Sequence, residues 1–222
     1  MDLIGTGITV ERGGRLALAA PDFRVNAGQA ARLTGPNGAG KSTLLRALAG
    51  LLPIASGDAR FGDASLSDDR EAMSQICAYA GHSDAVKPAM SVAENLESWA
   101  RLYSGSADRG RVADALARFG VDHIADAPAS YCSAGQKRRL GLARLLVTGR
   151  PLWLLDEPTV SLDAASVSVF AGLVAEHCAK GGVAIAATHI EIGLPDGPEI
   201  TLAPPEREAV EAGDAFLSGD WS

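Results

Sequence analysis

The chain has 222 residues, enough for one large domain, or for a domain with a subdomain, around a substantial buried core. Hydrophobic residues make up 47% of it, and the formal net charge of −7 argues against a surface that follows a nucleic acid backbone. Its three cysteines are far apart and form no CxxC pair, which predicts a reducing compartment and excludes a disulfide framework or a cysteine zinc site.

Short apolar runs alternate with longer helical patterns along the chain, which predicts an α/β fold with a largely parallel sheet. Residues 31–35 are expected to form a buried strand, and residues 41–52 a helix with its leucines on one side. The runs at 151–158 and 181–189 predict two more strands, which are too apolar to be exposed on either face.

Between about residues 88 and 148 the chain becomes mostly helical. Residues 91–103 begin with Ser91 and have Glu94 three positions later, which is the capping-box pattern of a helix N-terminus. Residues 111–121 predict a second helix. We therefore expect a helical unit inserted between the strands of the α/β core.

The segment GPNGAGKS at residues 35–42 matches G-x-x-x-x-G-K-[ST] and lies between a predicted strand and a predicted helix, as the motif requires. Its glycines let backbone N–H groups surround phosphate oxygens, and the helix that follows adds the positive end of its dipole. Lys41 would reach the β- and γ-phosphates of a nucleotide, Ser42 would bind Mg²⁺, and Thr43 would lie near the α-phosphate. The predicted nucleotide-binding residues of this loop are Gly35, Pro36, Asn37, Gly38, Ala39, Gly40, Lys41, Ser42 and Thr43.

Two adjacent acids end the apolar segment LWLLDEP. Asp156 would come beside the phosphate loop and hold Mg²⁺ through water, so the predicted metal residues are Ser42 and Asp156. Glu157 could orient and deprotonate an attacking water. Adjacent carboxylates after a buried strand are unfavourable unless they are paired or face a metal, which argues against simple exposure at a strand end.

The segment YCSAGQKRRLGLARLL at residues 131–146 predicts a helix that begins near Ser133, a residue type suited to an N-cap. The free N–H groups that follow Ser133 could bind an anion. We interpret the basic run KRR at 137–139 as a solvated face of this helix.

Residues 132–136, Cys-Ser-Ala-Gly-Gln, resemble the signature segment L-S-G-G-Q of ABC-transporter ATPases, with the leucine and the first glycine replaced. The segment lies 23 residues before Asp156 (156 − 133), as the spacing in that family requires. The resemblance extends over about residues 3–203. It implies that Ser133, Gly135 and Gln136 bind the γ-phosphate of ATP held by a second ATPase copy.

Two further segments follow in the order of that family. The tripeptide SLD resembles the D-loop, which would place Asp163 where two copies meet. His189, after the strand VAIAAT, resembles the switch histidine, which contacts the γ-phosphate and helps to hold the glutamate and the water. The resemblance thus implies Lys41, Glu157 and His189 as the catalytic set, with ATP and Mg²⁺ as cofactors.

Two positions depart from the family pattern. Where the family stacks adenine on an aromatic residue, this chain has VERGGR with Arg12 nearest the expected place, and Arg12 either stacks on the base or is exposed. Where the family has the Q-loop glutamine, this chain has His82. The imidazole of His82 could accept a hydrogen bond from a metal-bound water or ligate a metal, or His82 could simply cap the strand.

The YAGH run, the AENL helix, SAGQKRRL and an early Glu-Arg pair are most similar to the haem-exporter branch, the ATP-binding subunit of cytochrome c maturation. The resemblance implies an α/β fold of the ABC ATPase type: a P-loop NTPase with a mixed sheet core, an antiparallel β subdomain and an inserted α-helical subdomain. We expect a single domain over 1–222. It divides into a core with its β subdomain at 1–84 and 149–205, a helical subdomain at 85–148, and a tail at 206–222.

The resemblance implies an ATPase that closes head-to-tail on a second copy and drives separate membrane permease subunits, which would press their coupling helices near residues 82–100. No run of about 18 uncharged apolar residues is present and the N-terminus is unlike a secretory signal, so we expect a cytoplasmic protein. It would attach peripherally to the bacterial inner membrane through its partners, with no nucleic acid partner.

Other functions remain open on the sequence. An ATPase of another exporter, for lipid, drug or lipoprotein, fits the ATP-site motifs equally well, and only the region of His82 favours haem. A non-transport ABC protein acting on DNA or ribosomes would need a coiled-coil insertion or a second cassette. A P-loop kinase is disfavoured by the signature-like segment and by SLD.

Overall fold

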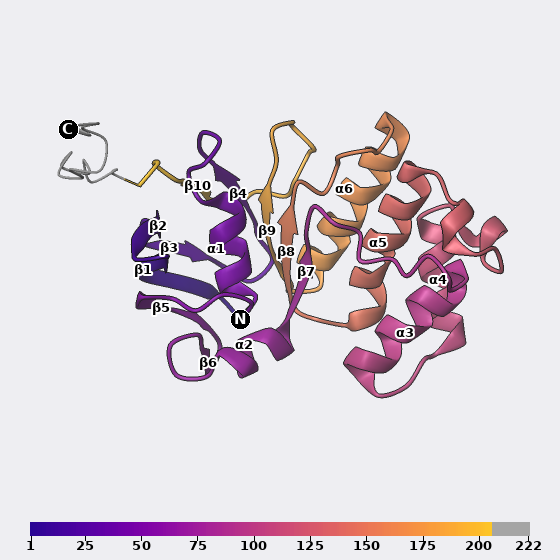
Figure 1. The fold of residues 1–222 in the computed structure, drawn as a ribbon, viewed down its shortest axis with the longest axis horizontal. Coiled ribbons are helices and arrows are strands. Elements are labelled where there is room, and N and C mark those ends of the chain that lie inside the picture. Colours follow the sequence, from indigo (N-terminus) through magenta and orange to yellow (C-terminus); the bar gives the residue numbers. More distant parts are fainter. Residues whose placement is uncertain (206–222) are drawn as a thin grey trace, which may run out of the picture.

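Two separate β-sheets organise residues 1–205, the part of the chain that the computed structural model describes (Figure 1). The first sheet is antiparallel and is built around β1, which pairs with β2, β3 and β5, while β6 extends it beyond β5. Its strands are β1 (Leu3–Arg12), β2 (Arg15–Ala19), β3 (Phe23–Val25), β5 (Ser56–Phe61) and β6 (Ala64–Ser65).

The second sheet is parallel, in the order β10-β4-β9-β8-β7. Its strands are β4 (Ala30–Thr34), β7 (Cys77–Ala80), β8 (Leu152–Asp156), β9 (Val183–Ala187) and β10 (Glu199–Thr201). The predicted α/β fold with an antiparallel subdomain is confirmed, but the two kinds of pairing lie in separate sheets instead of one mixed core sheet. Short hairpins join β1 to β2 and β5 to β6, whereas neighbouring parallel strands such as β7 and β8 are joined by long crossovers that contain helices.

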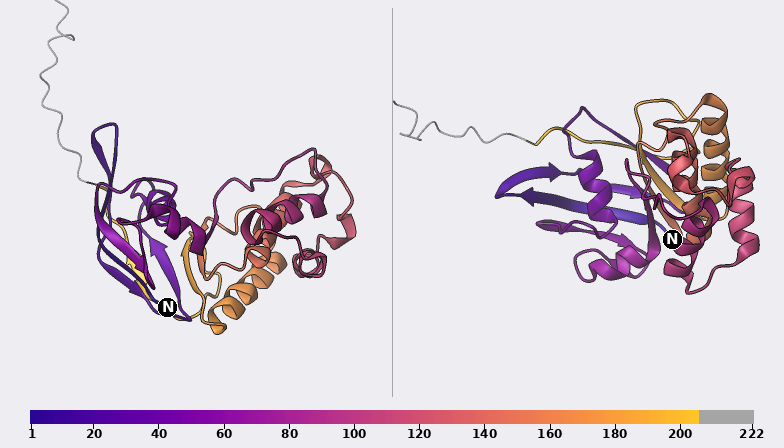
Figure 2. Two further views of the ribbon diagram at one scale, coloured as in Figure 1. Left: turned by 90° about the horizontal axis from the view of Figure 1, so that it is seen from below. Right: turned by 45° about the vertical axis from the view of Figure 1, so that its right-hand side comes forward.

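The parallel sheet is the middle layer of the structure. Successive side chains of a strand point to opposite faces. Leu152 and Leu154 of β8 pack with α1 and the antiparallel sheet, whereas Trp153 and Leu155 pack with the helices on the other side. Figure 2 shows these layers from two further directions. Because β8 and β9 are buried throughout, the prediction that both strands are covered on both faces is confirmed.

Six α-helices complete residues 1–205. Helix α1 packs between the sheets, while α3, α4 and α5 pack on one another (Figure 1). The bounds are α1 (Lys41–Leu48), α2 (Arg70–Ile76), α3 (Val92–Ser104), α4 (Arg109–Arg118), α5 (Ala134–Thr148) and α6 (Ala164–Ala179), with short 3-10 helices at Asp122–Ile124 and Ala129–Tyr131. No helix in this part of the chain is both long and apolar enough to span a bilayer.

The predicted capping box of α3 is confirmed. The N–H of Glu94 donates to Ser91 Oγ over 3.1 Å, and the N–H of Ser91 donates to Glu94 Oε2 over 2.8 Å. The subdomain boundaries at 85 and 148 stay a prediction, and the expected tail at 206–222 lies outside the described residues.

The interpretation of residues 137–139 as a solvated helix face is wrong for Arg138, whose surface is only 4% exposed. Its guanidinium turns toward the core and donates to carbonyl oxygens of two other segments. A buried arginine is stable only when its donors are satisfied, and periodicity alone did not reveal these acceptors.

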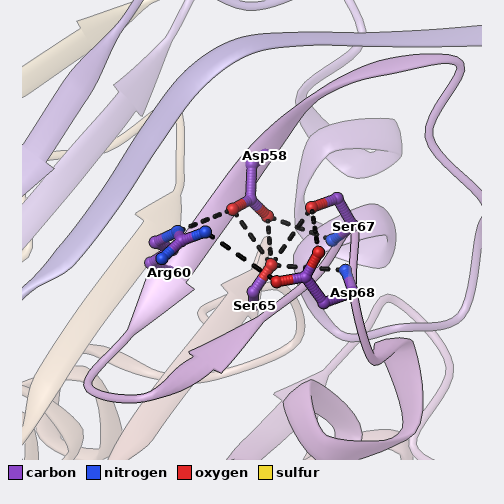
Figure 3. Close-up of polar contacts among 5 residues, drawn as sticks. All are labelled: Asp58, Arg60, Ser65, Ser67 and Asp68. Carbon is purple, nitrogen blue, oxygen red and sulfur yellow. Dashed lines mark hydrogen bonds and ion pairs between the residues drawn. The ribbon is translucent and has the colours of Figure 1, made fainter.

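The carboxylate of Asp58 closes the β5–β6 hairpin (Figure 3). It accepts hydrogen bonds from the Ser65 hydroxyl and the Ser67 N–H, each over 3.0 Å, and from Arg60 Nε over 2.9 Å. Burial raises the pKa of Asp58, but these hydrogen bonds outweigh burial and hold the pKa below its ordinary value.

Because the folded pKa of Asp58 is lowered, its stabilising effect is present above the unfolded pKa of about 3.9 and is lost as the pH falls through the folded pKa. Asp58→Asn is therefore expected to lower the Tm by about 2–6 °C at pH 7 and by less as the pH falls below about 4. Calorimetry of both proteins across this range measures the effect. Asp63→Asn, at an exposed acid of the same hairpin, is the control, and a pH-independent loss for Asp58→Asn contradicts the account.

Candidate functional site

The phosphate loop joins β4 to α1 at the carboxyl edge of the parallel sheet. Gly40 occupies the N-cap position of α1 with φ 97°, and a Cβ there would lie 2.9 Å from Leu18 Cδ1 of β2. Only glycine therefore allows this turn to pack against the antiparallel sheet. No side chain caps α1, so the N–H groups of its first turn are available to a phosphate.

The ammonium group of Lys41 folds back over this loop. Its Nζ donates to the carbonyl oxygens of Gly35 over 2.7 Å and of Pro36 over 3.2 Å. A cavity of about 270 Å³ is lined by Gly35, Lys41, Thr188, His189 and neighbouring residues. The phosphate loop and the predicted switch histidine thus border the same space.

Asp156, at the end of β8, is buried and accepts two hydroxyl hydrogen bonds. Ser42 Oγ donates to its Oδ1 over 2.9 Å, and Tyr79 Oη donates to its Oδ2 over 3.0 Å. A carboxylate beside a hydroxyl provides the hard oxygen ligands that Mg²⁺ prefers. The predicted pair of metal residues, Ser42 and Asp156, therefore lies in contact, and these donors fit that ion.

Sequence reasoning missed Tyr79 and Arg46. Arg46 Nε donates to Tyr79 Oη over 3.3 Å, and burial raises the pKa of Tyr79, so its hydroxyl stays protonated and can donate to Asp156. The available signal was weak: Arg46 lies four residues after Ser42, on the same face of α1, and Tyr79 lies three residues before His82.

Glu157 lies just beyond β8 with φ 50°, a left-handed conformation that costs a non-glycine residue roughly 1–2 kcal/mol. Its N–H donates to Ala187 O over 2.9 Å. Its carboxylate Oε1 lies 3.2 Å from His189 Nε2. The structure thus brings together the two residues that the sequence predicts as general base and switch histidine.

The signature-like segment forms the N-terminus of α5. Gln136 N–H donates to Ser133 Oγ over 3.2 Å and Ser133 N–H donates to Gln136 Oε1 over 2.8 Å, so the two side chains cap the helix reciprocally. A Cβ on Gly135 would lie 3.1 Å from Ser161 O, which makes this segment a neighbour of the SLD turn.

Asp163, the last residue of SLD, caps α6. It accepts from Ser166 N–H over 2.7 Å, and hydrogen bonding from Ser166 lowers the pKa of this exposed carboxyl.

The two residues that depart from the family pattern are both exposed. Arg12 ends β1 in the hairpin that leads to β2. His82 follows β7 and lines a groove of about 500 Å³ together with Tyr79, Trp99 and Tyr103. Adenine stacking by Arg12 and a metal or water contact of His82 stay predictions.

Comparison with known proteins gives the family. Residues 18–160 match the model of the family described as "ABC transporter". The chain belongs to this family. Two relatives called "Cytochrome c biogenesis ATP-binding export protein CcmA" are similar over most of its length. The protein of Paracoccus denitrificans (strain Pd 1222) is 50% identical over 197 residues, covering 89% of this chain and 87% of that protein. The protein of Paramagnetospirillum magneticum (strain ATCC 700264 / AMB-1) is 51% identical over 193 residues, covering 86% of this chain and 89% of that protein.

Solved structures agree with the ABC ATPase fold. An "ATP binding subunit of ABC transporter" has a TM-score of 0.82 at 22% identity, covering 92% of this chain and 87% of that one. A dimeric post-hydrolysis ATP-binding cassette bound to ADP and Pi has a TM-score of 0.77 at 23% identity, covering 93% of this chain and 96% of that one. As an ABC-type ATPase, the chain binds and hydrolyses ATP, and the predicted fold class and enzyme class are confirmed.

Tyr79→Phe should weaken Mg²⁺ use because it removes the hydroxyl that orients Asp156. The Mg²⁺ concentration for half-maximal ATPase activity is expected to rise roughly tenfold. A magnesium titration of activity measures this change, with Tyr131→Phe, at an exposed tyrosine, as the control. An unchanged titration curve would make Tyr79 a packing residue only.

Proposed function

We propose that this ABC-type ATPase powers an exporter that serves cytochrome c biogenesis, and that the compound delivered is haem. The identity of about half over some nine-tenths of the chain to proteins of cytochrome c biogenesis carries the proposal. His82, in place of the usual Q-loop glutamine, also favours this branch over exporters of lipid, drug or lipoprotein.

The catalytic roles that we propose are supported by the contacts at the carboxyl edge of the parallel sheet, where the 270 Å³ cavity lies between Gly35, Lys41 and His189. The first-turn N–H groups of α1 and Lys41 bind the phosphates, and Ser42 and Asp156 hold Mg²⁺, which neutralises phosphate charge when bound. Glu157 takes a proton from the attacking water, and His189 fixes the carboxylate of Glu157 through the 3.2 Å contact.

Two copies close head-to-tail in this proposal, so that each signature segment meets the ATP held by the other copy. Ser133 and Asp163 are exposed at the N-termini of neighbouring helices, where a second copy can reach them. A two-fold arrangement presents the same surface of both copies and makes both sites equivalent. One solved structure of the same fold is a dimer.

The groove beside His82 is the proposed docking site of the membrane permease subunits. Its wall contains the aromatic rings of Trp99 and Tyr103, and Leu51 and Leu102 on its rim are exposed. Exposed apolar residues around a groove are typical of a surface that another protein covers. This docking would hold the chain peripherally at the cytoplasmic face of the bacterial inner membrane.

Glu157→Gln is expected to leave ATP binding intact and to lower kcat by roughly a thousandfold, because the amide cannot take a proton from water. It should also trap an ATP-bound dimer, which size-exclusion chromatography detects. Glu71→Gln, at an exposed acid of α2, is the control. Turnover near that of the wild type would remove Glu157 as the base.

Deleting the chain from its host is expected to abolish c-type cytochromes while b-type cytochromes remain. Haem staining of separated membrane proteins measures this loss. The wild-type chain should restore the signal and the Glu157→Gln variant should not. Normal c-type cytochromes in the deletion strain would contradict the proposal and favour an exporter of another compound.

A further inference from the structure

The guanidinium of Arg138, on α5, connects two segments that are far apart in the sequence. Nη2 donates to Glu157 O over 2.6 Å, and Nε donates to Pro158 O over 3.0 Å. Nη1 donates to Gly81 O over 2.8 Å and to Asp84 Oδ1 over 3.0 Å. One side chain thus binds the turn that carries the catalytic base and the loop that carries His82.

The bond to Glu157 bears on its backbone conformation. The N–H of Glu157 is held by Ala187 O, and its carbonyl oxygen is held by Arg138. These two bonds fix both peptide groups of a residue whose φ is 50°. Without the guanidinium, the peptide after Glu157 is free to turn toward a more favourable conformation, which would move the carboxylate away from His189.

Helix α5 also lies close to the segment 79–85. A Cβ on Gly141 would lie 3.0 Å from the carbonyl oxygen and Cβ of Asp84, so a larger residue there would push the loop away. Arg144 Nη1 donates to Asp84 O over 3.0 Å, and Arg144 Nη2 donates to Tyr79 O over 2.9 Å. Arg138, Gly141 and Arg144 are spaced three apart and face this loop together.

The same loop forms part of the groove of about 500 Å³. Gly81, His82, Ser83 and Ala85 line it, as does Arg144. A molecule in the groove therefore touches a loop whose Gly81 and Asp84 are bonded to the guanidinium that also holds Glu157. One side chain, that of Arg138, thus connects the loop that lines the groove with the backbone of Glu157.

We propose that Arg138 is a positioning residue that sets Glu157 for water activation according to the position of the 81–85 loop. Nucleotide affinity does not depend on it, because the phosphate loop and Asp156 hold the nucleotide through other contacts. The effect of the groove on Glu157 rests on the proposed function, since it needs the membrane partner, whereas the effect of Arg138 on turnover does not.

The first test uses the full chain alone. Arg138→Gln is expected to lower kcat by about tenfold or more while the KM and Kd for ATP stay within about twofold, and Arg138→Lys should give an intermediate kcat. Arg118→Gln is the matched control, because Arg118 also bridges two helices, through Glu176, away from the site. A kcat within twofold of the wild type for Arg138→Gln, or an equal change in KM and kcat, overturns the proposal.

The second test uses the chain with its membrane subunits. Asp84→Ala removes the ion pair with Arg138 but leaves the bond to Glu157, so it should reduce partner-stimulated turnover several-fold more than basal turnover. Equal reductions overturn the loop connection. If Arg138→Gln does not fold, the kcat of Arg138→Lys and the stimulated and basal turnover of Asp84→Ala test the proposal instead. Absence of stimulation in the wild type would contradict the proposed function and leave the first test valid.

Discussion

The parallel pairing of β4, β9 and β8 places Ala187 opposite both Leu33 and Asp156, and the ATP site depends on this register. The segments that leave these three strands at the same edge carry the phosphate loop, Glu157 and His189. A shift by one residue would turn the alternating side chains to the wrong face and separate Ser42 from Asp156. The apolar residues on both faces of β8 and β9 make such a shift unfavourable, since each face packs in its own cluster.

Around this edge, further polar contacts hold the residues of the proposed site. Tyr79 and Ser42 orient Asp156, Ala187 and Arg138 hold the backbone of Glu157, and His189 lies against its carboxylate. Catalysis by positioned charges requires such preorganisation, because a carboxylate that must reorient loses much of its effect. In the proposed mechanism the phosphate loop binds the nucleotide, and Arg138 of the helical layer restrains the backbone of Glu157, the proposed base.

Helix α5 serves the site at more than one level. Its N-terminus carries the signature-like residues, and its second turn carries Arg138. Gly141 lies close to the 81–85 loop that lines the groove, and Arg144 donates hydrogen bonds to Asp84 O and Tyr79 O. The signature-like end and the contact to the turn of Glu157 thus lie on the same helix as the contacts to the loop that lines the groove. If the membrane subunits bind the groove as proposed, this arrangement connects them to the proposed base through one helix.

The sequence alone determined the family and the α/β fold, and it named the residues of the proposed ATP site, because motif spacing and apolar strands are local properties. It also predicted the capping box of α3, the strand that ends at Asp156 and the strand that precedes His189. It did not determine the separation of parallel and antiparallel strands into two sheets, the bond of Tyr79 to Asp156, or the burial of Arg138. Those features depend on contacts between residues that are far apart in the sequence. Arg138 lies 19 residues before Glu157 and 57 residues after Gly81, and it can donate to both carbonyl oxygens only once α5, β7 and β8 have packed. A basic run is exposed by default, and only the tertiary structure provided the acceptors that bury it.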